Sequence, residues 1–354
     1  MSSILVTGGA GFVGSNLAIG LAGRHPDWRV VALDNLYRRG SEMNLDRLAA
    51  AGVEFVRGDV RRPEDLSKLA PVDALVECSA EPSVMSGVDG DSSYLFETNL
   101  VGAYNCLELA RRNQCQFVFL SSSRVYPLAG LRAAVLEEAE TRYELAAEQT
   151  QVGWTGAGVV EDMPLAGPRT LYGSTKLAAE LLIAEYGEQF PVSTVINRCG
   201  VIAGPWQMGK VDQGVFTHWM LAHLRGQPLS YIGFGGSGKQ VRDLLHIADL
   251  VGLVELQLLD PDHWNGLTFN VGGGREVSLS LREASEICAR LTGGRVEVLS
   301  EPSERPGDVP VYLSDCSALF EHTDWRPRRD AETVMRDIWE WARPNLDRLD
   351  EATG

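Results

Sequence analysis

The stretch ILVTGGAGFVGSNLA, residues 4–18, is the starting point for interpreting this chain. It begins as a short apolar run that favours a strand and continues beyond Gly14 with apolar residues at helical spacing. Gly8, Gly11 and Gly14 lie between the two at a spacing of three. A strand that turns into a helix through glycines presents backbone N–H groups to a phosphate. The stretch therefore predicts a strand–turn–helix unit that binds the pyrophosphate of a dinucleotide.

An acidic residue follows at the distance that such a site requires. Residues 29–36, RVVALDNL, predict a second strand, and Asp34 stands twenty positions after Gly14. A carboxylate at this point hydrogen-bonds the ribose hydroxyls of adenosine. Its charge opposes a 2′-phosphate and so favours NAD over NADP, although Arg38 and Arg39 weaken that preference. The alternative is an ordinary βα turn followed by a helix-capping aspartate.

The alternation of strand and helix patterns continues along the first half of the chain. Further strands are expected at residues 53–60, 72–80, 116–123 and 192–201, and helices at residues 94–113 and 172–190. This regular alternation predicts an α/β fold with a doubly wound parallel sheet of the Rossmann type. Ligands bind such sheets beyond the carboxyl ends of the strands, where the glycine turn and Asp34 are expected to lie.

Composition limits the possible partners and the cellular location. The 354 residues exceed one compact core and suggest two lobes. The formal net charge of −16 does not suit binding to nucleic acid or to an anionic membrane. No apolar run approaches 18 residues, and the first expected strand begins at Ser3, so neither a membrane span nor a signal peptide is predicted. Six widely spaced cysteines without a CxxC pair predict reduced, mostly buried thiols, no metal site and a cytoplasmic protein.

A candidate catalytic pair stands at the beginning of the 172–190 helix. Tyr172 and Lys176 are four positions apart, which places both side chains on one face of the helix. A neighbouring ammonium and a positive nicotinamide ring both favour the phenolate, so Tyr172 is suited to act as a base near neutral pH. Ser122, near the end of the 116–123 strand, can hydrogen-bond the same substrate hydroxyl. A solvated i, i+4 pair is the alternative when the two helical residues are taken alone.

Together these segments resemble the extended short-chain dehydrogenase/reductases, the NAD-dependent epimerase/dehydratase family, in the branch that acts on nucleotide sugars. The resemblance rests on TGGAGFVG, Asp34, the pair at 58–59, Ser122 and the YGSTK segment, and it runs from residue 4 to about 342. Within that family the chain is most similar to the CDP-paratose 2-epimerases, also called CDP-tyvelose epimerases. This narrower similarity is carried by DNLYRRGSEMNLDRL, FETNLVGAYNCLE, VDQGVFTHWM, GKQVRDLLHIADL and FNVGGGREVSLSL.

The resemblance implies the ligand-binding residues and the domain limits. The residues that would bind NAD are Gly8, Gly11, Phe12, Val13, Gly14, Asp34, Asn35, Asp59, Val60, Ser79, Ala80, Asn99, Tyr172 and Lys176. The catalytic residues would be Ser122, Tyr172 and Lys176, and the substrate-binding residues Ser83, Ser123, Arg124, Gln213, Tyr231, Arg242 and Arg305. The expected NAD-binding Rossmann domain comprises residues 1–196, to which 243–270 return. Residues 197–242 and 271–354 would form a smaller α/β lobe that binds the nucleotide sugar.

Two arginines are expected to clamp the substrate's diphosphate. Arg242 and Arg305 are flanked by Gly or Pro in an otherwise acidic chain, and a guanidinium can bind a phosphate through two hydrogen bonds. Taken alone, they would be interpreted as surface residues, and it is the family pattern that assigns them to the diphosphate. Trp206, Trp219 and Tyr231 are candidates for stacking on the base, with core packing as the alternative.

The chain departs from the family at several positions. In the sugar 4,6-dehydratases an Asp-Glu pair follows the catalytic hydroxyl, whereas Ser123 and Arg124 stand here, so dehydration is not expected. Glu77 and Glu81 replace a usual His and Gln, and Val201 and Ala203 replace a usual Asn and Tyr. An acidic segment at residues 127–165 predicts either a helix-containing flap near the sugar, with Trp154 as a candidate member, or an inert surface excursion.

The predicted function is therefore NAD-dependent epimerisation of a nucleotide sugar, with a CDP-sugar and C2 favoured. The sugar would be oxidised transiently to a keto-sugar and reduced again on the opposite face. The alternatives are a nucleotide-sugar 4-epimerase, a net NAD-dependent nucleotide-sugar oxidoreductase and a non-catalytic NAD-binding module. The resemblance also implies a homodimer.

Overall fold

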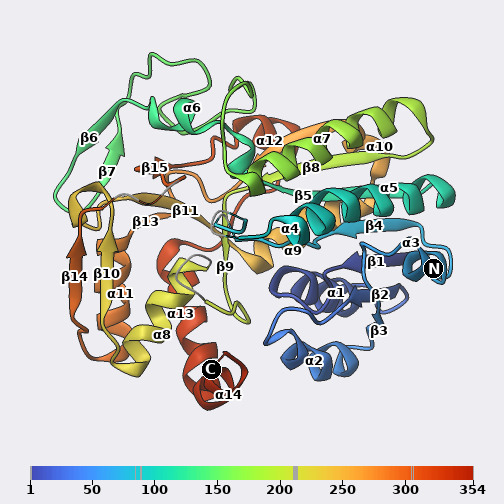
Figure 1. Cartoon of the computed structure of the whole chain (residues 1–354), viewed down its shortest axis with the longest axis horizontal. Helices are drawn as coiled ribbons and strands as arrows, with labels where there is room; N and C mark the ends of the chain where they lie inside the picture. The colour runs from blue at the N-terminus through green and yellow to red at the C-terminus, as the bar shows by residue number, and fades with distance from the viewer. Residues whose placement is uncertain are drawn as a thin grey trace.

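A parallel sheet of seven strands occupies one half of the protein in the computed structural model, which describes residues 2–83, 85–87, 90–209, 214–303, 305 and 307–353 (Figure 1). The strand order is β12-β8-β5-β4-β1-β2-β3, and every pairing is parallel. The strands are β1 (Ser3–Thr7), β2 (Arg29–Asp34), β3 (Glu54–Arg57), β4 (Ala74–Glu77), β5 (Gln116–Ser122), β8 (Thr194–Cys199) and β12 (Leu267–Val271). The predicted doubly wound Rossmann fold is confirmed.

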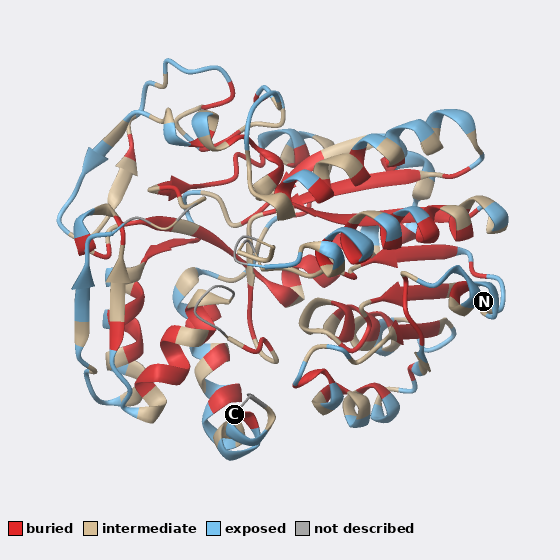
Figure 2. Cartoon of the chain, in the orientation of Figure 1, coloured by how far each residue is buried: buried red, intermediate tan, exposed pale blue. Residues whose placement is uncertain are grey.

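Helices cover both faces of this sheet because its strands are apolar on both sides. Ile4 and Val6 of β1 pack in one buried cluster with Leu250, whereas Leu5 packs in a second cluster with Leu107. The first face carries α1 (Phe12–Arg24), α2 (Leu45–Ala50), α9 (Ile247–Leu259), α10 (Pro261–Trp264) and α12 (Ser317–His322). The second carries α3 (Pro63–Ser67), α5 (Gly102–Asn113) and α7 (Leu171–Gln189). Figure 2 shows the strands as buried ribbons between helices whose outer faces are exposed.

The expected elements of the first half are present with shorter strands. The helix expected at 94–113 is built from α4 (Ser93–Phe96), a π-helical turn η2 (Glu97–Val101) and α5. The expected strands at 53–60 and 72–80 end at Arg57 and Glu77, because the residues beyond these points leave the sheet and form loops. Short 3-10 turns complete this half at η1 (Ser41–Asn44) and η3 (Ser123–Val125).

A smaller α/β lobe follows the sheet. Its central strand β11 (Val241–His246) pairs with β9 (Val201–Ala203), β13 (Ser278–Ser280) and β15 (Val311–Tyr312), and a separate pair joins β10 (Leu229–Ile232) to β14 (Val298–Glu301). Helices α8 (Val215–Arg225), α11 (Leu281–Thr292) and α13 (Ala331–Ala342) enclose its core with apolar side chains such as Phe216, Ile287 and Ile338. The remaining elements are η4 (Phe234–Gly236), η5 (Arg343–Asn345) and α14 (Leu346–Thr353).

The 127–165 segment lies against this smaller lobe (Figure 1). It contains α6 (Leu128–Arg132) and a hairpin of β6 (Leu136–Glu138) and β7 (Tyr143–Leu145). Its apolar residues, among them Leu131 and Trp154, form one cluster with Val241 and Val311 of the lobe. The segment is therefore packed into the fold along its length.

Two further sequence expectations concern the whole chain. None of the helices in the described part of the chain is long and apolar enough to cross a membrane. All six cysteines are free, and five of them are buried, with Cys78 half-buried. The thiols are therefore unpaired and mostly buried, as expected.

Candidate active site

The glycine turn between β1 and α1 has a backbone that only glycine can adopt. Gly8 has a φ of +60°, in the left-handed region that side chains disfavour. A Cβ atom on Gly14 would lie 2.2 Å from the carbonyl oxygen of Gly8, and one on Gly8 would lie 2.9 Å from the carbonyl oxygen of Cys78. The three segments β1, α1 and the end of β4 therefore pack closely. Gly11, the N-cap of α1, has no side chain that could cap the helix, so the N–H groups of the first turn of α1 can bind a phosphate.

A pocket of about 180 Å³ lies beside this turn. Of the residues predicted to bind NAD, those lining it are Gly8, Gly11, Phe12, Val13, Gly14, Asp34, Asn35, Val60, Ser79 and Ala80. Sequence reasoning did not assign Ser41, Asn44, Gly58 and Tyr94, which also line it, and it named Arg38 and Arg39 only as weakening the preference for NAD. A bare helix N-terminus, an acid at the end of β2 and flanking apolar side chains fit a dinucleotide.

Asp34 holds the turn as well as lining the pocket. Its two carboxylate oxygens accept hydrogen bonds from the backbone N–H groups of Leu36, at 2.8 Å, and Ala10, at 3.1 Å. Burial raises the pKa of the Asp34 carboxyl, and these hydrogen bonds only partly offset that effect. The carboxylate thus fixes the end of β2 to the glycine turn.

Four predicted cofactor ligands do not line this pocket: Tyr172 and Lys176 line the larger cavity described below, whereas Asp59 and Asn99 support residues around the pocket. Asp59 binds the Arg61 guanidinium at 2.7 Å and accepts a hydrogen bond from Asn35, which does line the pocket. Although burial acts in the opposite direction, these contacts lower the pKa of Asp59 to about 2. Asn99, in the π-helical turn, exchanges hydrogen bonds with the backbone of Glu81 at 2.7 and 3.1 Å. It therefore fixes the loop after β4.

A second, larger cavity of about 590 Å³ adjoins the first and shares Phe12, Val13, Cys78, Ala80 and Pro82 with it. The predicted catalytic residues Ser122, Tyr172 and Lys176 all line this cavity. The structure therefore brings the end of β5 and the first turns of α7 together in the wall of the larger cavity.

The first turn of α7 is held against the end of β5 by close backbone packing. A Cβ atom on Gly173 would lie 2.0 Å from the carbonyl oxygen of Arg124, so the YGSTK glycine allows this contact. Thr170 caps the helix by accepting a hydrogen bond from the Gly173 N–H. The Ser122 hydroxyl oxygen accepts the Arg124 N–H at 3.1 Å, and the hydroxyl keeps its own hydrogen to donate.

Lys176 is almost fully buried and is held by three groups. Its ammonium donates a hydrogen bond to the carbonyl oxygen of Leu120 at 3.0 Å and lies 3.6 Å from the Glu77 carboxylate. It also lies 4.4 Å from the centre of the Phe119 ring, within the range of a cation–π contact. The ammonium is therefore fixed beside Tyr172, one helical turn away on the same helix.

A buried ion pair fixes α7 below the catalytic residues. Glu180 of α7 binds Arg198 of β8 at 2.8 Å, and the Ser121 hydroxyl donates to Glu180 at 2.5 Å. Because Ser121 directly precedes Ser122, this network ties the catalytic helix to the strand that carries the catalytic hydroxyl.

Three arginines line the larger cavity. Arg124, Arg242 and Arg305 all contribute to its wall. Arg124 donates to the Gly307 carbonyl oxygen at 2.8 Å, and Arg242 binds the Asp308 carboxylate at 2.5 Å. Burial, reinforced by the charge of Arg242, lowers the pKa of the Arg124 guanidinium. Close cations of this kind suit an anionic ligand such as a diphosphate.

The other predicted substrate ligands have different positions. Ser123 lines the cavity, whereas Ser83 does not and accepts the Met85 N–H at 3.2 Å. Tyr231 is also absent from the wall. Its ring stacks on that of Trp219, with 6.4 Å between the ring centres, and its hydroxyl donates a hydrogen bond to the Ser285 hydroxyl. Trp219 itself lines the cavity. Gln213 lies outside the described residues.

Trp206, a candidate for stacking on the substrate base, instead lines the smaller pocket, 4.0 Å from the Arg47 guanidinium. Sequence reasoning also missed Gln240, His218 and Asp308 in the larger cavity. Gln240 had a detectable signal, because it lies two residues before Arg242 and so on the same face of an extended strand.

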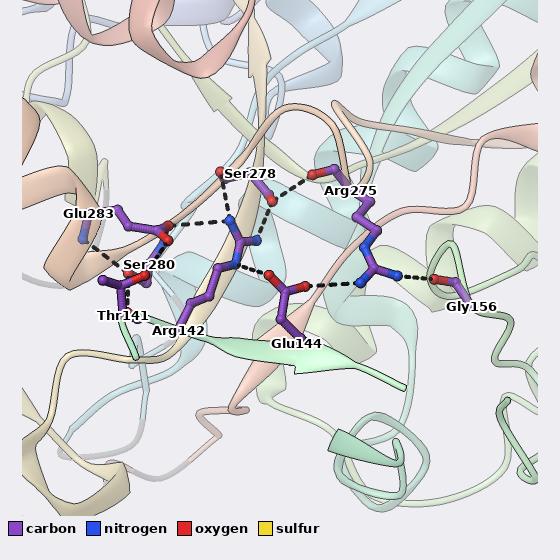
Figure 3. Close-up of polar contacts among 8 residues, drawn as sticks. All are labelled: Thr141, Arg142, Glu144, Gly156, Arg275, Ser278, Ser280 and Glu283. Atoms are coloured by element: carbon purple, nitrogen blue, oxygen red, sulfur yellow. Dashed lines mark hydrogen bonds and ion pairs between the residues drawn. The ribbon is translucent and has the colours of Figure 1, made fainter. Parts of the chain in front are cut away.

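The 127–165 segment contains a helix, as expected, but none of its residues is in the wall of the larger cavity. Trp154, the candidate member of a flap, is buried, donates to the Gly130 carbonyl oxygen at 2.9 Å and does not line the larger cavity. Figure 3 shows how the segment is attached to the smaller lobe: Arg142 contacts Glu144, Glu283 and Ser278. The segment is a brace behind the cavity wall, not an inert excursion.

Comparison with known proteins defines the class of this protein. Residues 4–272 match the family described as NAD dependent epimerase/dehydratase family, and the chain belongs to that family. It is an enzyme of that family, with NAD as its cofactor. The predicted family and cofactor are confirmed.

Among individual proteins, the chain is 28% identical over 347 residues to CDP-paratose 2-epimerase from Salmonella typhi, covering 96% of this chain and 98% of that protein. It is also 28% identical to dTDP-glucose 4,6-dehydratase from Mycobacterium tuberculosis, covering 97% of this chain and 93% of that protein. The crystal structure of UDP-glucose 4-epimerase from Thermus thermophilus in complex with NAD is similar with a TM-score of 0.75 and 27% identity, covering 96% of this chain and 99% of that one.

Proposed function

We propose that this enzyme epimerises a nucleotide sugar, with a CDP-sugar as the favoured substrate and C2 as the favoured carbon. The observation that carries the proposal is that Ser122, Tyr172 and Lys176 line the larger cavity, which adjoins the dinucleotide pocket. A substrate hydroxyl held there meets a phenol, a hydroxyl and an ammonium next to the cofactor. The similarity to CDP-paratose 2-epimerase supports the choice of cytosine as the nucleotide base and of C2 as the sugar carbon.

In this mechanism the residues of the chain position the sugar and move one proton. NAD, when bound, supplies the acceptor and then the donor of a hydride, so the net oxidation state of the sugar is unchanged. Tyr172, as the phenolate, takes the proton of the sugar hydroxyl, and Ser122 donates a hydrogen bond to the same oxygen. Lys176 stabilises the phenolate by its charge. When the sugar is reduced again, Tyr172 returns the proton.

The arginines would bind the diphosphate while the keto-sugar turns its opposite face toward the cofactor. Arg242 and Arg305 are assigned to the phosphates, and Arg124 is close enough to Arg242 and to Tyr172 for its charge to interact with both. A diphosphate held at one end leaves the keto-sugar able to turn within a cavity of about 590 Å³. Re-reduction on the opposite face then inverts the carbon.

The residues next to Ser122 support epimerisation over elimination of water. Ser123 and Arg124 follow the catalytic hydroxyl and both line the cavity, so neither position carries a carboxylic acid. Retention of the complete Ser122, Tyr172 and Lys176 set is unnecessary for a non-catalytic NAD-binding module. A 4-epimerase is the second candidate, because the same residues serve C4 and the UDP-glucose 4-epimerase structure is similar over nearly the whole chain.

A substrate panel tests the proposal. The purified enzyme is incubated with CDP-, UDP-, GDP- and dTDP-sugars, and NMR identifies which carbon is inverted. We expect a CDP-sugar to be inverted at C2 with cofactor that stays bound and no accumulation of NADH. Inversion at C4 would select the second candidate. A 4-keto-6-deoxy product would show a dehydratase, and one NADH formed per sugar would show a net oxidoreductase.

We also propose a homodimer formed through helices of the Rossmann half. Large apolar side chains are exposed on α4, η2, α5 and α7, namely Phe96, Val101, Tyr104 and Leu181, with Leu181 64% exposed. Burying such a surface against a second copy would remove apolar area from water. Light scattering coupled to size exclusion is expected to give twice the chain mass of 38.6 kDa. The cytoplasmic location stays a prediction.

A further inference from the structure

A second ionisable group lies in contact with the catalytic lysine. Glu77 ends β4, is 1% exposed, and places its Oε2 atom 3.6 Å from the Lys176 ammonium. Its Oε1 atom accepts a hydrogen bond from the Thr7 hydroxyl at 3.5 Å. Within the described part of the chain Oε2 has no hydrogen-bond donor at normal distance, and the Lys176 ammonium is the cation beside it; the Ser79 backbone N–H also favours the carboxylate. A carboxylate buried in this way depends on a counter-ion.

Among the described residues, the three thiols that face this pair are neutral. Cys78 follows Glu77 directly, Cys106 approaches from α5 and Cys199 from β8, and their charges would act on Glu77 or Lys176. Burial raises the pKa of the Cys78 and Cys106 thiols well above its usual value, and that of Cys199 to about 12. These thiols are therefore uncharged at neutral pH.

Glu77 and Lys176 thus form an isolated pair of opposite charges at the end of the sheet. Burial raises the pKa of the Glu77 carboxyl, and the Lys176 ammonium partly offsets this effect. On the other side, Tyr172 also faces Arg124, whose charge interacts with the phenol. The phenol is therefore placed near two cations, one of which has a buried counter-ion.

We propose that Glu77 is a positioning residue that acts through Lys176, as an ionised counter-ion that raises the pH at which the Tyr172–Lys176 pair loses its first proton. This inference rests on the proposed role of Tyr172 as the base and deepens it. Glu77 does not contact the substrate: the walls of both pockets contain Cys78 but not Glu77.

The direction of the effect follows from charge alone. In the proposed mechanism the phenol gives up its proton while Lys176 stays protonated, so the Tyr172 titration reports the first proton that the pair loses. A negative charge beside the pair makes that loss harder, and removing the charge makes it easier. Glu77→Gln keeps the shape and removes the charge, and it is expected to move this ionisation about one pH unit lower.

The test is a titration of the phenolate by ultraviolet difference absorbance in the NAD-bound enzyme. Subtracting the titration of Tyr172→Phe isolates the contribution of Tyr172. We expect the Tyr172 signal in Glu77→Gln to appear about one pH unit lower than in the wild type, and the acidic limb of the kcat profile to move with it. Glu188→Gln, a carboxylate change at an exposed position of the same helix α7, is the matched control. It is expected to leave both curves in place.

An unchanged titration, or a shift to higher pH, in Glu77→Gln would overturn the inference. A merely structural role for Glu77 would lower the melting temperature without moving the titration. Because the titration needs no substrate, it separates this inference from the proposed function. A failed substrate panel with a shifted titration would refute only the function, and a successful panel with an unmoved titration would refute only the role of Glu77.

Loss of a counter-ion beside a buried ammonium can also prevent folding of Glu77→Gln. In that case the carboxyl resonance of Glu77 is assigned in the carbon NMR spectrum of glutamate-labelled protein. The resonance that is present in the wild-type enzyme and missing from the charge-conserving variant Glu77→Asp belongs to Glu77. We expect the Glu77 resonance at the chemical shift of an ionised carboxylate at pH 7. A protonated carboxyl at that pH would overturn the inference.

Discussion

The two adjoining pockets are built in different ways. The smaller pocket is built around one contiguous turn, residues 8–14, to which Asp34 is bound, and loops at the ends of the neighbouring strands complete its wall. The larger cavity takes Arg124 from η3, Arg242 from β11 and Arg305 from a loop, residues that are far apart in the sequence. The cofactor side therefore depends on local backbone shape, whereas the substrate side depends on how two lobes are assembled.

A change of Tyr172, the proposed catalytic base, should have the largest effect on kcat. Tyr172→Phe removes the proton acceptor and keeps the ring, so we expect kcat to fall about 10²–10⁴-fold. NAD should stay bound, because the glycine turn and Asp34 are unchanged. Kinetics measure the first effect, and the mass or absorbance of the cofactor released from the purified protein measures the second.

Tyr104→Phe is the control for this prediction. Tyr104 lies on α5 and is 44% exposed, so the same change of side chain there should leave kcat unaltered. Normal turnover by Tyr172→Phe would exclude the phenol as the base.

Adding a single methyl group tests whether NAD binding depends on the backbone shape of the glycine turn. Gly14→Ala would place a Cβ atom 2.2 Å from the Gly8 carbonyl oxygen. The turn must then shift, which costs about 1–3 kcal/mol and corresponds to about 10–100-fold weaker binding of NAD. Titration calorimetry with NAD and thermal unfolding measure the two effects.

Gly23→Ala provides a control on the same helix. Among the described residues, no atom beyond the adjoining backbone of the helix lies within 4 Å of a Cβ built at Gly23, so alanine fits there and should stabilise the protein by about 0.4–1 kcal/mol without changing the affinity for NAD. Equal affinities of Gly14→Ala and the wild type would contradict a phosphate-binding role for the turn.

This contrast explains how much could be predicted from the sequence. The strands, the glycine turn and the Tyr172–Lys176 spacing could be predicted because each is encoded by residues that lie close together in the sequence. Which loop residues reach the larger cavity depends on contacts between distant segments. The aromatic character of Tyr231 favours a place in the substrate site, but its strand turns the ring behind Trp219.

The substrate side is tested by removing one charge. Arg242→Ala is expected to raise KM about 10–100-fold, because a hydrogen bond to a charged group contributes about 1.5–3 kcal/mol, while kcat at saturation changes little. Steady-state kinetics with the substrate identified by the panel measure both constants. An equal loss in kcat and in kcat/KM would indicate a contact made only in the transition state.

Arg295→Ala is the matched control for the charge. The Arg295 side chain is 76% exposed and pairs with Glu286 at the surface, so its removal should leave KM unchanged. Because Arg242 also binds Asp308, a thermal melt of Arg242→Ala must accompany the kinetics to separate lost binding from lost structure.

The brace behind the cavity is the part of the molecule that the sequence described least well. An acidic segment with one tryptophan is compatible with a flap or with a surface loop, because neither composition nor periodicity reveals what it packs against. Its position is set by contacts more than a hundred residues apart, such as the hydrogen bond of the Thr141 hydroxyl to Glu283 and that of the Ser280 hydroxyl to the Thr141 carbonyl oxygen (Figure 3).

The smallest effect on catalysis is therefore expected from Arg142→Ala. The Arg142 side chain is 16% exposed and contacts Glu144 at 3.0 Å and Glu283 at 3.3 Å, so its loss should lower the free energy of unfolding by about 1–3 kcal/mol. Arg275→Ala removes a 43% exposed partner of Glu144 and should cost less than about 1 kcal/mol. Urea denaturation measures both, and KM should stay constant in each. A raised KM with unchanged stability in Arg142→Ala would instead mean that the segment moves over the substrate, because a brace acts on the substrate only through the stability of the wall it supports.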